Sequence, residues 1–226
     1  MSLRNDIDNG VDMERLSLFS QSDVPRETLR TQYGIPKDAF VVGRMGRLAF
    51  DKCFEEWMIA CKKFQDSGLC ENPYFLIVGG EAASTPGYEG RLKVMAASLP
   101  LKNTVFVPAV ESAGWALEAM DIFMYPSPTE GFGLAYIEAM AFGVPTILWD
   151  NELTREIAMG GAMLCGSNIQ ALHETLAYLF LNPSIRQQFA EAGKLHVIAA
   201  GFTVDKMVEK YCQTYLEFKE TAVAAV

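Results

Sequence analysis

Short apolar runs recur along the whole chain, and several of them end in Gly, Pro, Ser or Asp. Each run is about four to seven residues long, which fits a buried strand and is far too short for a membrane span. Strands that are covered on both faces show this nearly continuous apolar character. The pattern therefore predicts six strands, at residues 39–45, 74–80, 104–110, 121–127, 144–150 and 162–167.

Between these runs, apolar residues recur three and four positions apart, as on one face of a helix. The spacing predicts helices at 54–64, 90–99, 114–121 and 169–180, followed by two C-terminal helices at about 183–199 and 203–220. Strands that alternate with helices are typical of a parallel sheet. We therefore predict an α/β fold: a doubly wound, six-stranded parallel Rossmann-like sheet with helices on both faces.

In such a sheet, ligands bind beyond the carboxyl ends of the strands, where the strand order reverses. Two loops at these ends carry unusual residues, one at 43–52 after the first run and one at 126–133 after the fourth. The candidate site is therefore built from these two loops.

Glu138 lies in the helix that should follow the second loop. On a helical wheel it falls about 40° from Leu134, on the same side as Ile137 and Ala141. A carboxylate on that apolar side is costly unless it accepts hydrogen bonds. We interpret Glu138 as a ligand-binding residue; a glutamate at the helix edge that reaches water is the alternative.

Gly131, Phe132 and Gly133 stand where this helix should begin. Two glycines on either side of an aromatic residue let backbone N–H groups approach a bulky ligand closely. The amides and the dipole of a helix N-terminus favour an anion. The motif thus predicts phosphate binding here, and an ordinary glycine-rich turn is the alternative.

Glu130 precedes the helix, at about 10 Å from Glu138 by helical rise. This separation is too large for the paired carboxylates of a retaining glycosidase, which lie about 5 to 5.5 Å apart. We therefore expect the two glutamates to contact different parts of one ligand.

The first loop carries Arg47 and Lys52, five positions apart, just after Gly46. Lys52 stands at the expected start of a helix, where a cation opposes the helix dipole unless an anion lies close by. An arginine fork and a lysine point charge can together neutralise a diphosphate without a metal. Two solvated surface cations are the alternative. Arg44, inside the strand pattern, receives no assignment.

The composition narrows the choice of partners. The chain of 226 residues has a net charge of −9, with acidic residues spread along it, which argues against nucleic-acid or anionic-membrane surfaces. Any polyanionic ligand must then be met by local cations. Five cysteines without a CxxC motif indicate a reduced, cytoplasmic chain and no metal site.

The run EGFGLAYIE, from Glu130 to Glu138, resembles the motif of two glutamates separated by seven residues in retaining GT-B glycosyltransferases (group 1, family 4). Further segments resemble this family and follow its order along the chain: NGVD (9–12), VGRMGRLAFDK (42–52), FLIVGG (75–80), DIFMYPSPTEGFG (121–133), GVPTILWD (143–150) and LNPSIRQQF (181–189). The resemblance covers the chain from about residue 9 onward.

This resemblance implies hexosyl transfer from a nucleotide-diphosphate sugar to an acceptor hydroxyl, with retention of configuration and without a metal or another cofactor. The expected catalytic residues are Arg47, Lys52 and Glu130, the first two holding the diphosphate and the third contacting the sugar. The expected donor-binding residues are Gly46, Gly131, Phe132, Gly133, Leu134 and Glu138, with Glu138 accepting from the ribose hydroxyls. Residues 108–110 are expected to read the base.

The sequence departs from the family pattern at two places. The family's Lys-Gly pair is Lys52-Cys53 here, and its frequent Asp-x-Gly-Gly is replaced by DNELT at 150–154. The second change alters the loop expected on the sugar side.

The family also has an N-terminal domain of similar size that carries the acceptor site. We therefore expect residues 1–12 to be a linker and 13–226 to be the donor-binding half, an isolated fragment that is inactive by itself. Its expected partners are the donor, an acceptor sugar, lipid or other hydroxyl compound reached through the absent domain, and a second copy of the chain by self-association. The full-length protein is expected to be cytoplasmic or peripheral at the membrane.

Two questions stay open at this stage. The last helix, with Met207, Val208, Tyr211, Tyr215 and Phe218, either covers its own sheet or leaves an apolar patch exposed. The alternative functions are a sugar-nucleotide epimerase of the same architecture and a noncatalytic nucleotide-sugar-binding module. An NAD-dependent oxidoreductase is disfavoured because no G-x-G-x-x-G follows any predicted strand.

Overall fold

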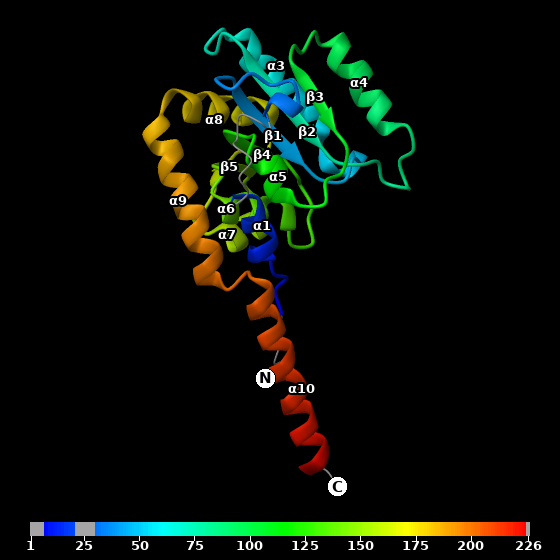
Figure 1. Ribbon diagram of the computed structural model, residues 1–226, viewed down its shortest axis with the longest axis vertical. Helices are drawn as coiled ribbons and strands as arrows, with labels where there is room; N and C mark the ends of the chain where they lie inside the picture. Colours follow the sequence, from blue (N-terminus) through cyan, green and yellow to red (C-terminus); the bar gives the residue numbers. More distant parts are fainter. Residues whose placement is uncertain (1–6, 21–29, 225–226) are drawn as a thin grey trace.

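Six parallel strands form the centre of the fold, in the order β3-β2-β1-β4-β5-β6 (Figure 1). The structure is a computed structural model that describes residues 7–20 and 30–224. All six predicted strands and the predicted fold class are confirmed. The strand order reverses between the two central strands, which places the switch point between them. The strands are β1 (Phe40–Met45), β2 (Pro73–Val78), β3 (Thr104–Val107), β4 (Ile122–Tyr125), β5 (Thr146–Trp149) and β6 (Met163–Cys165).

Both faces of the sheet are buried, which explains the continuous apolar runs. In β1, Val41 and Met45 belong to the hydrophobic cluster on one face, whereas Val42 belongs to the cluster on the other. In β4, Phe123 and Met124 divide in the same way. Successive side chains of a strand point to opposite faces, so a strand buried on both sides has no polar face.

Three helices supply the cluster on one face: α3 (Phe54–Asp66), α4 (Tyr88–Ser98) and α8 (Ile169–Leu181). The other face is covered by α1 (Met13–Ser20), α5 (Ala113–Leu117) and α6 (Leu134–Phe142), and α9 (Pro183–Ala200) packs on α6. Figure 1 shows α9 running along the side of the domain. A 3₁₀ turn, η1 (Phe50–Lys52), precedes α3.

Two short helices had no periodic signal in the sequence: α1 and α7 (Glu152–Ala158). Helix α7 begins inside the DNELT segment, where a capping box specifies its start. The Asn151 side chain accepts from the Thr154 backbone amide, and the Thr154 hydroxyl accepts from the Asn151 amide, both at 3.0 Å. This reciprocal pair satisfies two amides that a helix end otherwise leaves unpaired.

The segment before α1 is attached to the start of α10 (Val204–Ala224). Val11 donates to the Phe202 carbonyl and accepts from the Val204 amide, and its side chain is buried. Val11 lies inside the expected linker, and its backbone pairs with the domain through these bonds.

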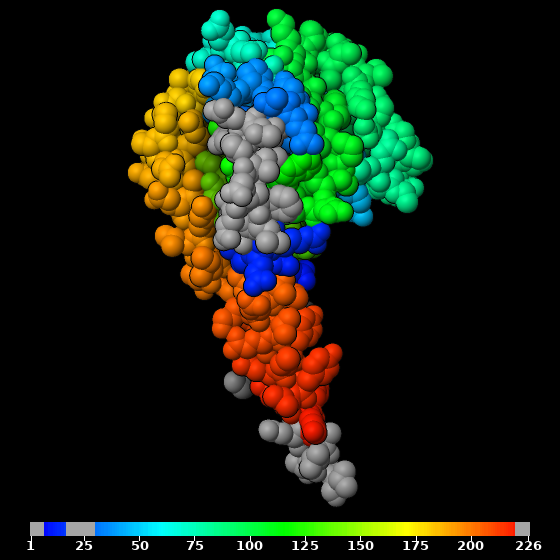
Figure 2. Space-filling model, in the orientation of Figure 1, coloured from blue at the N-terminus to red at the C-terminus, as the bar shows by residue number. Residues whose placement is uncertain are grey.

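Helix α10 projects away from the rest of the domain (Figures 1 and 2). Of the two outcomes left open for this helix, the structure shows the exposed apolar patch: Val208, Tyr211, Tyr215, Leu216 and Phe218 are all exposed. We call these five residues the α10 stripe. Among the described residues, no helix is long and apolar enough to cross a membrane.

Candidate functional site

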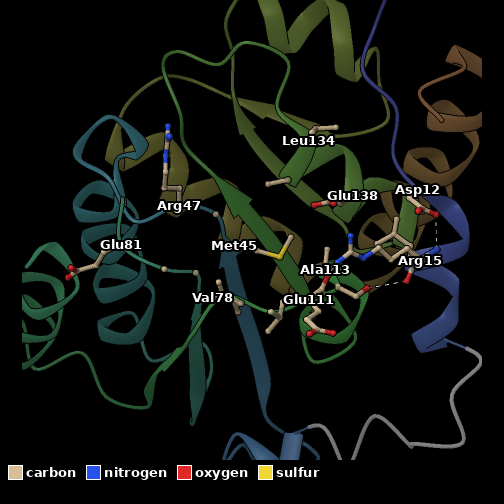
Figure 3. Close-up of a pocket in the computed structure, with 18 residues that line it drawn as sticks. Asp12, Arg15, Met45, Arg47, Val78, Glu81, Glu111, Ala113, Leu134 and Glu138 are labelled. Carbon is tan, nitrogen blue, oxygen red and sulfur yellow. Dashed lines mark hydrogen bonds between the residues drawn. The ribbon is translucent and has the colours of Figure 1, made fainter. Parts of the chain in front are cut away.

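A cavity of about 620 Å³ lies at the switch point of the sheet, beyond the carboxyl ends of the strands (Figure 3). We call it the α6 cavity. It is lined by Asp12 and the first turn of α1 (Arg15, Leu16), the ends of β1 and β2 with the loops after them (residues 45–47 and 78–81), the loop after β3 with the start of α5 (residues 109–113), and the first turns of α6 (Leu134, Ala135, Glu138). Its volume is within the range of small-molecule sites. The structure therefore places Gly46 and Arg47 of the first predicted loop beside the start of α6, whereas Lys52, Glu130 and residues 131–133 do not line this cavity.

The N-terminus of α6 borders this cavity. Gly133 is its N-cap residue with φ of 91°, and no side chain of the described residues caps the helix. A Cβ at Gly133 would lie 1.8 Å from the Tyr136 ring, so a larger residue is excluded by both backbone and space. Gly131 is exposed. The Phe132 ring packs edge-on against the Phe202 ring, with 5.2 Å between the ring centres. The helix thus presents uncapped amides and a positive dipole end toward the cavity.

Glu138 lies inside the α6 cavity, one turn along the helix. Burial raises the pKa of this carboxyl to about 7, and the nearby Arg15 guanidinium opposes the rise. Figure 3 shows Glu138 beside Arg15 at one side of the cavity. The expected inward position of Glu138 is therefore found, although Leu134 of the same wheel side is 43% exposed. A carboxylate held at this cost is suited to accept hydrogen bonds from a ligand.

Arg15 was not predicted as a site residue. Its guanidinium donates to the Glu111 carbonyl, and its backbone carbonyl accepts from the Ser112 hydroxyl at 3.1 Å. These bonds hold α1 against the loop after β3. The sequence carried no signal for this contact, because the two segments lie far apart in the chain.

Two other acidic residues at the cavity are occupied by backbone amides. Asp12 accepts from the Arg15 amide, and Glu81 accepts from the amides of Gly87 and Glu89. These hydrogen bonds cap the starts of α1 and α4, because each carboxylate accepts from a backbone amide that the helix itself leaves unpaired.

Arg47 lies on the opposite side of the cavity from Glu138 (Figure 3), and its neighbour Gly46 also lines the cavity. Gly46 has φ of 148° and its carbonyl lies where a Cβ on Gly79 would stand, so the loops after β1 and β2 pack backbone against backbone. Arg47 is exposed. The loop therefore places an exposed cationic side chain at the edge of the cavity.

Lys52 and Glu130 form an ion pair. Lys52 Nζ donates to Glu130 Oε1 at 2.8 Å, and both side chains are only 13% exposed. The same oxygen accepts from the hydroxyls of Tyr125 and Ser127, each at 2.8 Å. Three donors on one oxygen fix this carboxylate in place.

Glu130 lines a second hollow of about 430 Å³, together with Tyr125, Tyr136 and residues 151–154 at the start of α7. We call it the Glu130 hollow. Glu138 and Glu130 thus face different spaces, one on each side of the α6 N-terminus.

Cys53, where the family has glycine, adopts a left-handed conformation with φ of 51° and ψ of 46°. It is the N-cap residue of α3 and follows Lys52 directly. This backbone conformation is strained for any residue other than glycine, because the Cβ atom crowds the following carbonyl oxygen. The structure therefore explains why glycine is the usual residue at this turn.

A third hollow of about 450 Å³ lies beside the α6 cavity. It is mostly apolar and is lined by residues 107–112 and Trp115. Residues 109–112 also line the α6 cavity. The loop expected to read the base is therefore next to the cavity.

Comparison with known proteins identifies the family. A sequence profile of the glycosyl transferases group 1 family matches residues 25–196. An uncharacterized glycosyltransferase of Haemophilus influenzae is 29% identical over 170 residues, which cover 72% of this chain and 44% of that protein. A D-inositol 3-phosphate glycosyltransferase of Actinosynnema mirum is 28% identical over 214 residues, covering 91% and 50%. The chain thus spans about half the length of the curated relatives it matches.

Solved structures share the fold at lower identity. HepE of Anabaena, crystallised in complex with UDP-glucose, superposes with a TM-score of 0.80 at 20% identity, over 92% of this chain and 56% of that one. The C-terminal domain of LpcC, a glycosyl transferase group 1 family protein of Francisella tularensis, gives a TM-score of 0.69 at 20% identity, over 86% of this chain and 100% of that one. The resemblance inferred from the motifs is confirmed by the profile match, and the chain belongs to the glycosyl transferases group 1 family.

Proposed function

We propose that this chain binds a nucleotide-diphosphate sugar and serves as the donor-binding half of a transferase that retains the anomeric configuration. The observation that carries the proposal is the α6 cavity, where the uncapped N-terminus of α6 faces a cationic loop across a space of about 620 Å³. Helix N-termini and arginine side chains both favour phosphate groups. The complex of HepE with UDP-glucose, a protein of the same fold, supports the assignment.

In the proposed complex, the nucleoside occupies the α6 cavity. The Glu138 carboxylate accepts from the ribose hydroxyls, which offsets the cost of its burial. The diphosphate lies at the α6 N-terminus, between Arg47 and Lys52. The base lies toward residues 108–110, and the sugar points into the Glu130 hollow.

Lys52 can serve this ligand without leaving Glu130. An ammonium group has three N–H donors, and the contact with Glu130 Oε1 uses one of them. Asp51 Oδ2 also lies 3.5 Å from this Nζ. A donor is still left for the β-phosphate, so Lys52 would link the diphosphate to the carboxylate beside the sugar. In catalysis, Arg47, Lys52 and the α6 dipole would stabilise the charge on the departing diphosphate.

The wider reaction belongs to the proposal as well. The acceptor is a sugar, lipid or other hydroxyl compound, and its site lies outside this chain. The leaving phosphate takes the acceptor's proton, and no metal is needed because the cations and the helix N-terminus carry the neutralisation. All five cysteines are free thiols, which supports a reducing, cytoplasmic location.

Thermal unfolding with a ligand panel tests the donor site. We would compare UDP, GDP, ADP and their common sugar conjugates, each with and without EDTA. A ligand at 100 times its Kd adds about 2.7 kcal/mol, which raises the Tm of a chain of this size by roughly 5 to 10 °C. We expect one base to give this shift, with EDTA leaving it unchanged.

Two variants make the test specific. Glu138→Ala should abolish the shift, whereas Glu111→Gln, an exposed carboxylate at the same cavity, should keep it. The donor-site assignment is wrong if no nucleotide shifts the Tm, or if Glu138→Ala leaves the shift intact.

Turnover requires a polypeptide that also contains the acceptor site. There, Lys52→Ala should lower kcat at least about tenfold, because it removes one charge-stabilising group. The anomeric configuration of the product, read by NMR, tests retention. Epimerised sugar nucleotide formed without any acceptor would contradict transfer and favour the epimerase.

A further inference from the structure

Arg44 is a charged residue in the core of the sheet, and no role has yet been assigned to it. It lies on β1 and is fully buried. Its Nη1 donates to the Cys53 carbonyl at 3.1 Å, while Nε and Nη2 have no hydrogen-bond partner among the described residues. Burial lowers the pKa of Arg44 to about 10, so the group stays charged at neutral pH. A buried charge with unpaired donors is costly, and its position needs an explanation.

Two aromatic rings hold the guanidinium. Its Cζ lies 4.2 Å from the centre of the Phe54 ring and 5.0 Å from the centre of the Tyr125 ring. Such contacts between a cation and the face of a ring are attractive, and more so where water is excluded. Arg44 therefore fixes the Tyr125 ring on one side and the first residue of α3 on the other.

Two of the contacts of Arg44, with the Tyr125 ring and with the Cys53 carbonyl, connect it to Glu130 Oε1. The hydroxyl of Tyr125 donates to Glu130 Oε1 at 2.8 Å. The carbonyl that Arg44 binds belongs to Cys53, the neighbour of Lys52, whose Nζ donates to Glu130 Oε1 at 2.8 Å. Of the three donors to this oxygen, Arg44 therefore contacts one directly, Tyr125, and the residue next to another, Cys53 beside Lys52.

We propose that Arg44 is a positioning residue that fixes the Lys52–Glu130 ion pair and, through it, the way Lys52 meets a diphosphate. Arg44 acts on Lys52 through the left-handed turn at Cys53, and on Glu130 through the Tyr125 hydroxyl. Its part in fixing the pair is independent of any ligand. Its part in diphosphate binding rests on the proposed function.

The ion pair can be tested without a ligand by the reactivity of lysines. Limited acetylation with an amine-reactive reagent, followed by peptide mass spectrometry, measures the rate at each lysine. In Arg44→Met we expect Lys52 to react at least about fivefold faster than in the unchanged chain, the change expected for loss of about 1 kcal/mol of protection. Lys62 and Lys93 serve as internal references, because general unfolding would raise their rates too.

Arg186→Met is the matched control. Arg186 also makes a cation–ring contact, 5.3 Å from the centre of Phe40, and donates to the carbonyls of Leu179 and Phe180. It lies on α9, away from the ion pair, so its loss should leave the Lys52 rate unchanged. An equal rise of the Lys52 rate in both variants, or no rise in Arg44→Met, would overturn the proposal.

Arg44→Lys decides the matter if Arg44→Met does not fold. Lysine keeps the charge, but its single ammonium cannot reproduce a planar group held between two rings. The Lys52 rate should then rise above that of the unchanged chain, by less than about fivefold, with the reference lysines unchanged. A rate equal to that of the unchanged chain would overturn the role of Arg44.

Nucleotide affinity tests the second half of the proposal. With UDP and UMP as probes, and GDP and GMP in parallel, Arg44→Met should weaken the diphosphate at least about fivefold and the monophosphate less than twofold. Equal losses for both would refute the link to the diphosphate. If the unchanged chain binds none of these nucleotides, the proposed function fails, and the lysine rates still decide whether Arg44 fixes the ion pair.

Discussion

Replacing Glu138 with glutamine removes a charge that the folded chain holds in a partly closed cavity. Burial raises the pKa of Glu138 from its ordinary value of 4.5 to about 7. Below about pH 4.5 the carboxyl is protonated in both the folded and the unfolded state, so it contributes nothing to pH dependence. Between about pH 4.5 and 7 the unfolded state loses the proton first, and the stability of the folded state falls. Above about pH 7 the cost stays constant.

The magnitude follows from the shift. About 2.5 pKa units at 1.36 kcal/mol each would give about 3 kcal/mol. The α6 cavity is open to solvent, which screens the charge, so we expect about 1 to 2 kcal/mol. Glu138→Gln, which mimics the protonated carboxyl, should therefore raise the Tm at pH 8 by roughly 2 to 8 °C.

The assay is thermal unfolding of both chains at pH 5.5 and pH 8 without ligand. Glu138→Gln should be clearly more stable than the unchanged chain at pH 8, and the difference should shrink at pH 5.5. Glu111→Gln, an exposed carboxylate at the same cavity, should change the Tm little at either pH. A Tm difference for Glu138→Gln that is the same at both pH values would refute the reasoning, as would a less stable variant at pH 8.

Three further substitutions test local features by thermal or denaturant unfolding. Cys53→Gly should be more stable than Cys53→Ala by about 1 kcal/mol, because only glycine adopts the left-handed turn without strain; the opposite order would show that the turn rearranges. Gly133→Ala should cost about 1 to 3 kcal/mol and weaken nucleotide binding, since the new methyl group meets the Tyr136 ring; unchanged values for both would contradict the close packing. Asn151→Ala should cost about 1 kcal/mol by removing the side chain that caps α7, and a loss below about 0.3 kcal/mol would mean that the capping box contributes little.

The sequence predicted the sheet well because each strand is buried on both sides and leaves a continuous apolar run. It did not predict α1 and α7, which are short and carry few periodic apolar positions. Helix α7 did have a readable signal, since Asn151 and Thr154 have the spacing of a capping box.

At the candidate site, local sequence information indicated the position of some side chains and not of others. Glu138 faces the cavity, as its place on the helical wheel indicated, whereas Leu134 is exposed because it begins α6 at the cavity mouth. The Lys52–Glu130 pair joins residues 78 positions apart, and no local pattern encodes such a contact. Arg44 could be noticed as a charge in a strand, but only the fold shows the rings around it.

The bonds between Val11 and the segment around Thr203 have a mechanical consequence. The chain enters the domain and passes into α10 at one place, where Val11 exchanges two backbone hydrogen bonds with Phe202 and Val204. Lys210 and Asp8 extend the attachment with an ion pair at 3.2 Å. These bonds join the segment before α1 to the start of α10, so a change in the direction of α10 would carry that segment with it. The sheet would keep its register while the two joined segments reorient together.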